Sequence, residues 1–466
     1  TAMGYQALTN FTTGGSNTAM GRKALEDVSS GGYNVAVGNE AGLNLTTGGE
    51  NVFLGISAGG NTTDVDKAVL IGGGAGTGVL TSAADGIVLI GYTAGQSITS
   101  GAANTVIGYE SGKALTTGGS NISLGYQAHL ALVSGDNNVA IGVNAADAMA
   151  VGESENIAIG TSALGGMDEG TAGGDIDGNI AIGHAALVGG DLAGNDRQVQ
   201  DNIAIGRNSL NSTSDNAQTG TIAIGKDALT ALTSGAGNTA IGYLAMATST
   251  VNHSNVAIGY AAMRYSNGSE SQNVAIGYEA GTSMDNNDSS KSILIGYRAG
   301  KGGTGEIDRC VVIGDGAMDG TGAVGAQQNI FIGNDAGGGT WTTAASNSNV
   351  AIGATAMADA LNGALGNTAL GHDTLKALTS GDYNVAVGHN AGSTVTVGGG
   401  NTLLGRSSGG SLTTGVDNVL IGGYAGNAHN QSYVVCIGAS SGQHSGGSSV
   451  HIGRLAGRFM GGIHNV

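Results

Sequence analysis

A glycine recurs at intervals of about seventeen residues, and this period constrains the fold more than any other feature. Each copy is a small or apolar residue, then Ile, Val, Leu or Met, then Gly, and 26 copies run through the 466 residues. Of the 25 intervals, 12 are 17 residues long, and the others range from 15 to 23. A period this short is about one turn of a solenoid.

The full unit reads Asn-Val-Ala-Ile-Gly-x-x-Ala, as in Asn255 to Ala262. Asn stands four residues before the Gly in 18 of the 25 copies that have this position, and Ala stands three after it in 21 of 26. Alternation puts Val256 and Ile258 on one face and Ala257 on the other, which indicates a strand. The recurrent Asn predicts a ladder of stacked amides at a corner.

We therefore predict an all-β fold, a parallel β-solenoid formed by residues 1–466 as one repeat array. Each coil should hold one strong strand, a second short strand after the repeat Ala, and Gly-rich corners such as Thr46 to Gly49. The chain has no Pro, as a continuous ladder of hydrogen bonds requires. With 90 Gly and 11% charged residues, the composition excludes an ordinary multidomain enzyme.

The two faces of the strand lead to an expectation about assembly. We expect the Val and Ile side chains to fill the inside of the coil. The Ala and Gly face would then allow close approach of another chain, in a parallel homo-oligomer with a trimer as the first choice. Alternatively, Ala and Gly occur there only because the coil is flat and tight.

Charge and composition limit the partners. The formal net charge of -18 argues against nucleic acid or an anionic membrane as a partner. No apolar run is long enough to predict a membrane span, and two Cys cannot form a disulfide framework. The scattered His residues form no HExxH pair and no recurring cluster with Cys or Asp, so the sequence predicts no zinc or catalytic site and no enzyme.

The unit Asn-x-Ala-Ile-Gly-x-x-Ala/Ser resembles the head repeats of YadA-like trimeric autotransporter adhesins and the related repeats of bacteriophage tail fibres. The resemblance implies a left-handed parallel β-roll, three chains side by side, and an extracellular role in attachment, on a virion tail fibre or a bacterial cell surface. Because the chain begins and ends inside a repeat, we expect it to be a piece of a longer fibre.

The leading hypothesis is a structural and adhesive fibre shaft that carries a binding surface for a glycan or protein receptor. The alternative is a polysaccharide-degrading phage tail spike, which would need carboxylate pairs in a surface groove. An ice-binding solenoid would need a regular Thr array, and Thr pairs are absent from many coils.

Tyr is the residue directly after the repeat Gly in several consecutive coils, so these rings should form two stripes. Such stripes could stack on sugars, or they could simply stack on one another. The receptor-binding candidates are Tyr92, Tyr109 and Tyr126 in the first stripe and Tyr243, Tyr260, Tyr278 and Tyr297 in the second.

The places where the period lengthens supply further candidates. The two 23-residue intervals predict protruding loops at 165–178 and 188–201. Their acidic side chains, among them Asp168, Glu169, Asp175 and Asp177, could bind Ca²⁺, although a solvated acidic insertion is the simpler interpretation. Trp341, the only Trp, lies in a Gly-rich loop and could be a recognition anchor or fold back onto the coils.

Overall fold

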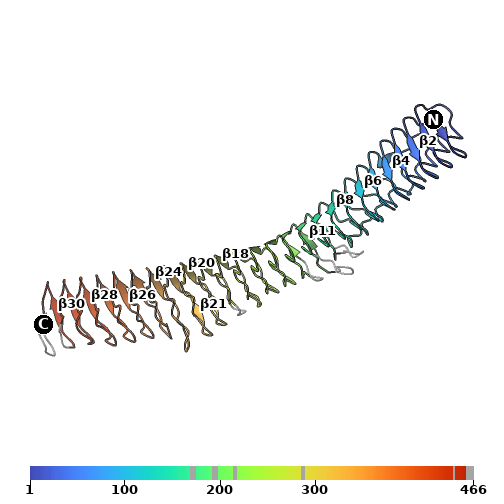
Figure 1. The fold of residues 1–466 in the computed structure, drawn as a ribbon. Coiled ribbons are helices and arrows are strands. Elements are labelled where there is room, and N and C mark those ends of the chain that lie inside the picture. The colour runs from blue at the N-terminus through green and yellow to red at the C-terminus, as the bar shows by residue number, and fades with distance from the viewer. Residues whose placement is uncertain (168–174, 191–197, 214–217, 285–288, 444–446, 458–466) are drawn as a thin grey trace. The chain divides into compact units, whose positions relative to one another are not determined.

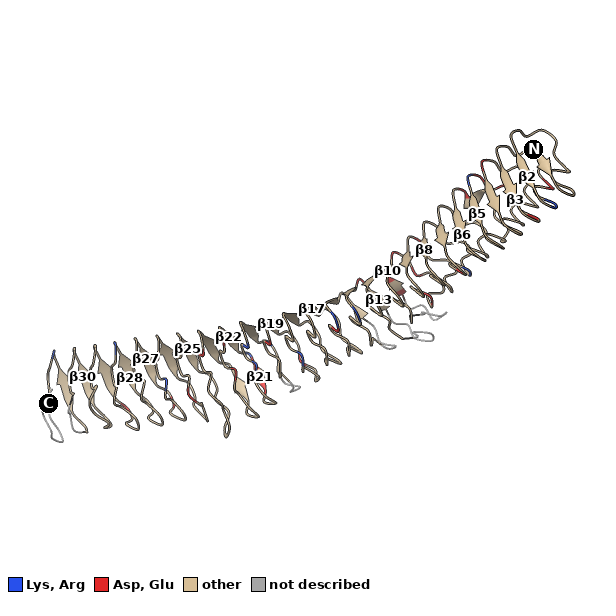
Figure 2. Cartoon of the chain, in the orientation of Figure 1, with Lys and Arg blue, Asp and Glu red and all other residues tan. Residues whose placement is uncertain are grey.

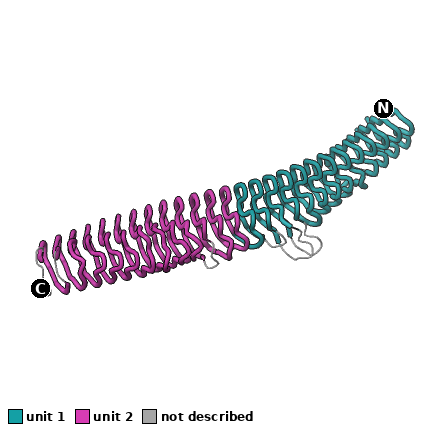
Figure 3. The backbone as a smooth tube through the Cα atoms, turned by 60° about the horizontal axis from the view of Figure 1, so that its bottom comes forward, with its two compact units in different colours: residues 1–237 teal, residues 238–466 magenta. Residues whose placement is uncertain are grey.

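The computed structural model describes residues 1–466 except 168–174, 191–197, 214–217, 285–288, 444–446 and 458–466. The protein is a parallel β-solenoid, as predicted, with one short strand in each coil (Figure 1). In the described ranges the only helix is the 3₁₀ turn η1 (Ser82–Ala84). The chain divides into two compact units, residues 1–237 and 238–466 (Figure 3).

In the first unit, each strand of the main ladder pairs in parallel with the strand of the next coil, with equivalent repeat positions opposite each other. The strands are β1 (Ala2–Met3), β2 (Thr18–Met20), β3 (Val35–Val37), β4 (Val52–Leu54), β5 (Val69–Ile71), β6 (Val88–Ile90), β7 (Thr105–Ile107), β8 (Ile122–Leu124), β9 (Val139–Ile141), β10 (Ile157–Ile159), β12 (Ile180–Ile182), β14 (Ile203–Ile205) and β16 (Ile222–Ile224).

The second unit has the same main ladder and the same register. Its strands are β17 (Thr239–Ile241), β18 (Val256–Ile258), β19 (Val274–Ile276), β20 (Ile293–Ile295), β22 (Val311–Ile313), β24 (Ile330–Ile332), β25 (Val350–Ile352), β26 (Thr368–Leu370), β27 (Val385–Val387), β28 (Thr402–Leu404), β29 (Val419–Ile421), β30 (Val435–Ile437) and β31 (Val450–Ile452).

The prediction of a second short strand after the repeat Ala is wrong for the described residues. The residue after this Ala has a left-handed conformation, with a φ of 48° at Met263, which ends extended structure. Additional strands lie before the Asn position instead, and only in some longer coils. They are β11 (Asp175–Asp177), β13 (Gln198–Gln200) and β15 (Gln218–Thr219) in the first unit, and β21 (Ile307–Asp308) and β23 (Ala326–Gln327) in the second.

The predicted orientation of the strand is also wrong. Ala257 is fully buried inside the coil, whereas Val256 and Ile258, on either side of it, are partly exposed. Ala262 and Met263 of the same coil are also fully buried. The core is therefore made of the middle strand residue and the residues after the repeat Gly, and the Val and Ile side chains form the outer face.

Inside the coil, a large residue in the strand is matched by a small one after the Gly. Coils with Ala in the middle of the strand often have Leu or Met four residues after the Gly, as in the pair Ala257 and Met263. Where the strand carries Leu294 or Phe331, the later position is Gly300 or Gly337. A Cβ atom on Gly300 would lie 2.6 Å from Leu294 Cδ2, so the interior holds only one large side chain at this level.

The repeat Gly is required by both its conformation and its neighbours. Gly259 has a φ of 136°, which L side chains rarely adopt. A Cβ atom there would lie 2.3 Å from the carbonyl oxygen of Gly277, the equivalent residue of the next coil. The same close approach recurs from coil to coil, so the period follows from the backbone contact.

The predicted amide ladder is confirmed. The backbone N–H of Asn273 donates to Asn255 Oδ1 at 2.9 Å, and Asn255 Nδ2 donates to the carbonyl of Glu270 at 2.9 Å. Both Asn side chains are fully buried. Each amide thus satisfies backbone groups that the corner leaves without a partner in the main ladder.

Candidate functional site

Both predicted Tyr stripes are present as stacks of exposed rings. Neighbouring ring centroids lie 5.3 and 5.4 Å apart in the stripe of the first unit, and 5.5, 4.9 and 5.3 Å apart in that of the second. The rings remain between 41% and 55% exposed. Burial, followed by the charge of Glu279, raises the pKa of Tyr278, so this phenol is neutral at neutral pH. The stripes present exposed aromatic surface to the surroundings.

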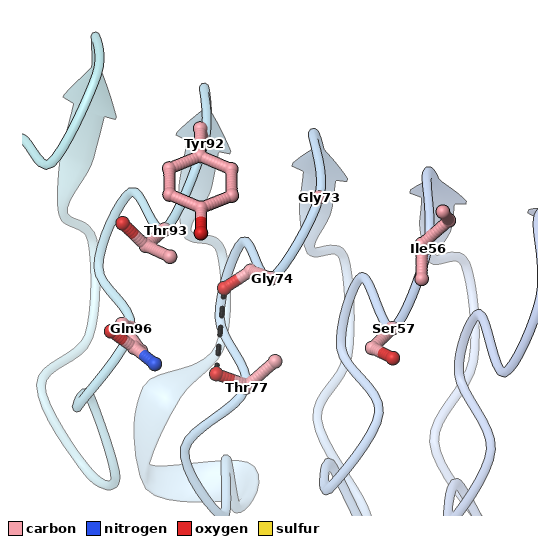
Figure 4. A pocket seen from close by; sticks show the side chains of 8 residues that line it. All are labelled: Ile56, Ser57, Gly73, Gly74, Thr77, Tyr92, Thr93 and Gln96. Atoms are coloured by element: carbon pink, nitrogen blue, oxygen red, sulfur yellow. Dashed lines mark hydrogen bonds between the residues drawn. The ribbon is translucent and has the colours of Figure 1, made fainter.

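The first Tyr stripe ends at a cleft of about 380 Å³. Gly73 occupies the position that Tyr92 holds in the next coil and Ile56 holds in the previous one, so the column lacks one side chain (Figure 4). The backbone ladder continues through the gap, because Gly74 N–H donates to Ile56 C=O and Thr93 N–H donates to Gly73 C=O, both at 3.0 Å. The cleft is therefore a gap between side chains on a continuous backbone.

Polar uncharged groups line the rest of this cleft. They belong to Ser57, Thr77 and Gln96, and no lining residue carries a charge. Thr77 Oγ1 donates to Gly74 C=O at 3.4 Å. Thr93 lines the cleft with its methyl group, since a Cβ atom on Gly74 would lie 3.3 Å from Thr93 Cγ2, and its hydroxyl is buried.

The outer face of the main ladder is a second candidate surface. Its strands contain no Asp, Glu, Lys or Arg, and Figure 2 shows the charged residues away from this ladder, mostly on the turns. Many outer side chains are substantially exposed, for example Val35 at 40%, Leu124 at 42% and Ile293 at 39%. A three-residue strand is about 10 Å long and coils repeat every ~4.8 Å, so ten coils present roughly 500 Å² of this face.

Trp341 is not available as a surface anchor, which corrects one of the two interpretations of its loop. The side chain is fully buried and meets the Phe331 ring edge-on, with the centroids 6.0 Å apart. Gly337 leaves room for the Phe331 ring, and the longer coil lets the Trp ring pack against it. Trp341 is a core residue in this structure.

The acidic candidates are only partly described. Asp168 and Glu169 lie outside the described residues, as does much of the two predicted loops at 165–178 and 188–201. Asp175 and Asp177 belong to β11, which pairs with β13, so these ends of the two insertions form ladder structure. Asp175 Oδ2 accepts from the Gln200 amide at 3.3 Å, and Asp177 Oδ1 accepts from Ser154 N–H at 2.7 Å.

Burial raises the pKa of Asp177, and the nearby carboxylates of Asp175, Glu155 and Asp201 raise it further. Across the parts of the chain that the structure describes, no three His, Cys, Asp or Glu side chains are grouped so that they could hold a metal ion. Calcium binding by these insertions stays a prediction.

Two groups with catalytic chemistry are buried in the core. His129 Nδ1 lies 2.7 Å from Ser123 Oγ, both residues are fully buried, and burial lowers the pKa of His129 to about 3. Cys310 is a buried free thiol whose pKa is raised by burial to about 11. His129 is therefore a neutral imidazole and Cys310 a protonated thiol, and neither is accessible to a substrate. Both are core residues.

Sequence reasoning missed the cleft beside Tyr92. The signal was available, because aligning the coils puts Gly73 in a column where the two neighbouring coils carry Ile56 and Tyr92.

Comparison with protein-family models gives no match to this chain, and comparison with curated protein sequences gives none either. None of the described helical structure is long and apolar enough to span a membrane.

Proposed function

We propose that this chain is the shaft of an extracellular fibre, built from several parallel copies of itself, that attaches a virion or bacterial cell to a surface receptor. The observation that carries the proposal is the uncharged outer face of Val, Ile and Leu on the main ladder. Parallel sheets are normally covered on both faces, and an exposed apolar area above a few hundred Å² is typical of an interaction surface. The inner face is covered by the coil itself, whereas the outer face needs a partner.

The repeat favours another copy of this chain as that partner. Apolar side chains on the outer face recur with every coil, so a partner must present apolar groups at the same ~4.8 Å rise along its length. A parallel copy meets this condition automatically, and the absence of charge on the main strands means that the two facing surfaces do not repel each other. The resemblance of the repeat to trimeric adhesin heads and tail fibres supports three copies.

The attachment role is supported by the exposed Tyr stripes. Stacked neutral rings held by the ladder lose little conformational freedom on binding, which favours recognition of flat or weakly polar ligands.

Analytical ultracentrifugation of the full chain tests the assembly. Three outward changes, Ile258→Lys, Ile276→Lys and Ile295→Lys, place charges on the face and should convert a trimer into separate chains. The matched control is Ser254→Lys with Gln272→Lys, at exposed corner positions where the next coil already has Lys291. A wild-type chain that sediments as a monomer at all concentrations would refute the shaft made of several copies.

A further inference from the structure

The side-chain column that contains the first Tyr stripe has a single gap between large apolar residues. Ile56 and Tyr92 occupy the same place two coils apart, and Gly73 stands between them (Figure 4). The missing side chain leaves room for about one ring, since adjacent rings of this stripe are 5.3 Å apart. Tyr109 stacks on the Tyr92 ring on the side away from the gap.

The lining shows which kind of ring fits. One wall is aromatic and 55% exposed at Tyr92, and the other is aliphatic and 64% exposed at Ile56. The electron-rich face of an aromatic ring attracts the weakly positive C–H bonds of a sugar ring. The volume of about 380 Å³ is near the lower end of the roughly 300–1,000 Å³ that is usual for ligand pockets, as one ring requires.

The polar groups distinguish a sugar from a purely aromatic ligand. Hydroxyl and amide groups of Ser57, Thr77 and Gln96 lie along the cleft, and these groups both donate and accept hydrogen bonds. Ligand hydroxyls can bond to them, whereas a benzene-like ring cannot.

We propose that the cleft at Gly73 binds a single neutral pyranose unit of a glycan, with the C–H face of the sugar against Tyr92 and its hydroxyls bonded to the polar lining of Ser57, Thr77 and Gln96. The absence of charged lining residues excludes a preference for uronic acids, sialic acids or phosphorylated sugars. As a receptor subsite, this assignment rests on the proposed attachment function; as a sugar site, it stands on the cleft alone.

The second unit offers a matched comparison at Gly423, which stands in the same column position. Its surroundings differ, because its column neighbours are Arg406 and Ala439, neither of which is aromatic. The position at Gly423 thus lacks the aromatic wall that Tyr92 gives the cleft. Adding a side chain at Gly423 therefore controls for the effects of filling a glycine position without filling the cleft at Gly73.

The test is saturation-transfer NMR on the full chain with the methyl glycosides of glucose, galactose, mannose and N-acetylglucosamine. At least one should bind, and Gly73→Tyr should weaken its binding more than tenfold by filling the gap. A Cβ atom at Gly73 would meet only Tyr92 Cδ2, at 3.8 Å, so this variant should fold. Gly423→Tyr should bind as wild type does.

Gln96→Leu separates recognition from packing. It removes the amide and keeps a side chain of similar length, so sugar binding should weaken about fivefold, the usual effect of one hydrogen bond. Thermal stability should stay about the same, because Gln96 is a partly exposed side chain. The site is refuted if none of the four glycosides binds, if binding persists in Gly73→Tyr, or if methyl glucuronide or phenol binds more tightly than every neutral glycoside.

An attachment assay with the same variants distinguishes the two proposals. Sugar binding without attachment to any glycan-coated surface would refute the adhesive function and leave the sugar site standing. Attachment that Gly73→Tyr leaves unchanged would refute the cleft as the receptor subsite while the shaft function stands.

Discussion

The inner and outer faces of most strands are both apolar, yet different rules govern the size of their side chains. Inside, Ala257 faces Met263 and Leu294 faces Gly300, so volume in one position is offset by its loss in the other. Outside, Val, Ile and Leu recur without any such exchange. The inner rule is set by the coil itself, because its two sides lie a fixed distance apart. No segment of the same coil lies against the outer face. The size of an outer side chain is therefore limited only by whatever covers that face.

The largest loss of stability is expected where the backbone of the next coil limits the size of a side chain. Gly259→Ala should destabilise its coil by about 4–5 kcal/mol, since a left-handed backbone and a 2.3 Å contact with the Gly277 carbonyl both oppose a Cβ atom. Hydrogen exchange of the amides around 239–277 should rise sharply. Gly423→Ala is the control, because its Cβ atom would meet only the Arg406 carbonyl oxygen at 3.9 Å. Equal protection in the two variants would contradict the close-approach explanation of the period.

The pair of Ser123 and His129 occupies the two inner positions that hold Ala257 and Met263 in another coil. This polar pair predicts that the stability of the coil depends on pH. His129 has a folded pKa of about 3 because of burial, against about 6.5 when unfolded, so the unfolded chain binds more protons between these values. Stability therefore falls as the pH drops below 6.5, by about 1.4 kcal/mol per pH unit from this residue until the pH approaches 3. Hydrogen exchange of residues 105–142 between pH 6.5 and 4.5 measures the loss, after correction for the intrinsic exchange rate.

The control for this pH dependence is Ser123→Ala with His129→Leu, which gives the coil the Ala and Leu pair found at Ala158 and Leu164. This variant should lack the local pH dependence. If it loses protection as steeply as wild type, the buried imidazole is not the cause.

The sequence was sufficient for the period, the strand, the Asn ladder and the Tyr stripes, because each depends on contacts between equivalent positions. It was misleading about which face is inside. Alternation of Val256, Ala257 and Ile258 separates two faces but cannot orient them when both are apolar. The decisive information lies in the correlation between the middle strand residue and the position after the Gly, such as Leu294 with Gly300.

Trp341 shows a different limit of sequence reasoning. A lone Trp on a Gly-rich loop fits both an exposed anchor and a core residue. Its burial depends on Phe331 in the preceding coil segment and on the space that Gly337 leaves, which is a three-dimensional relation. The Gly73 cleft differs in this respect, because aligning the coils by sequence already shows the missing side chain.

The last comparison enlarges one side chain on each face of the same strand. Ala257→Leu adds volume to an interior already filled by Met263, so it should cost about 1–3 kcal/mol, the usual effect of overpacking. Adding Met263→Gly should recover most of this loss, because it recreates the pair of Leu294 and Gly300, and Met263 already has a φ of 48° that Gly adopts readily. Val256→Leu, on the outer face, should change the stability of the separate chain by less than about 0.5 kcal/mol. Chemical denaturation of all four proteins at low concentration checks the series. If Val256→Leu costs as much as Ala257→Leu, or if Met263→Gly fails to rescue, the size rule does not belong to the inner face alone.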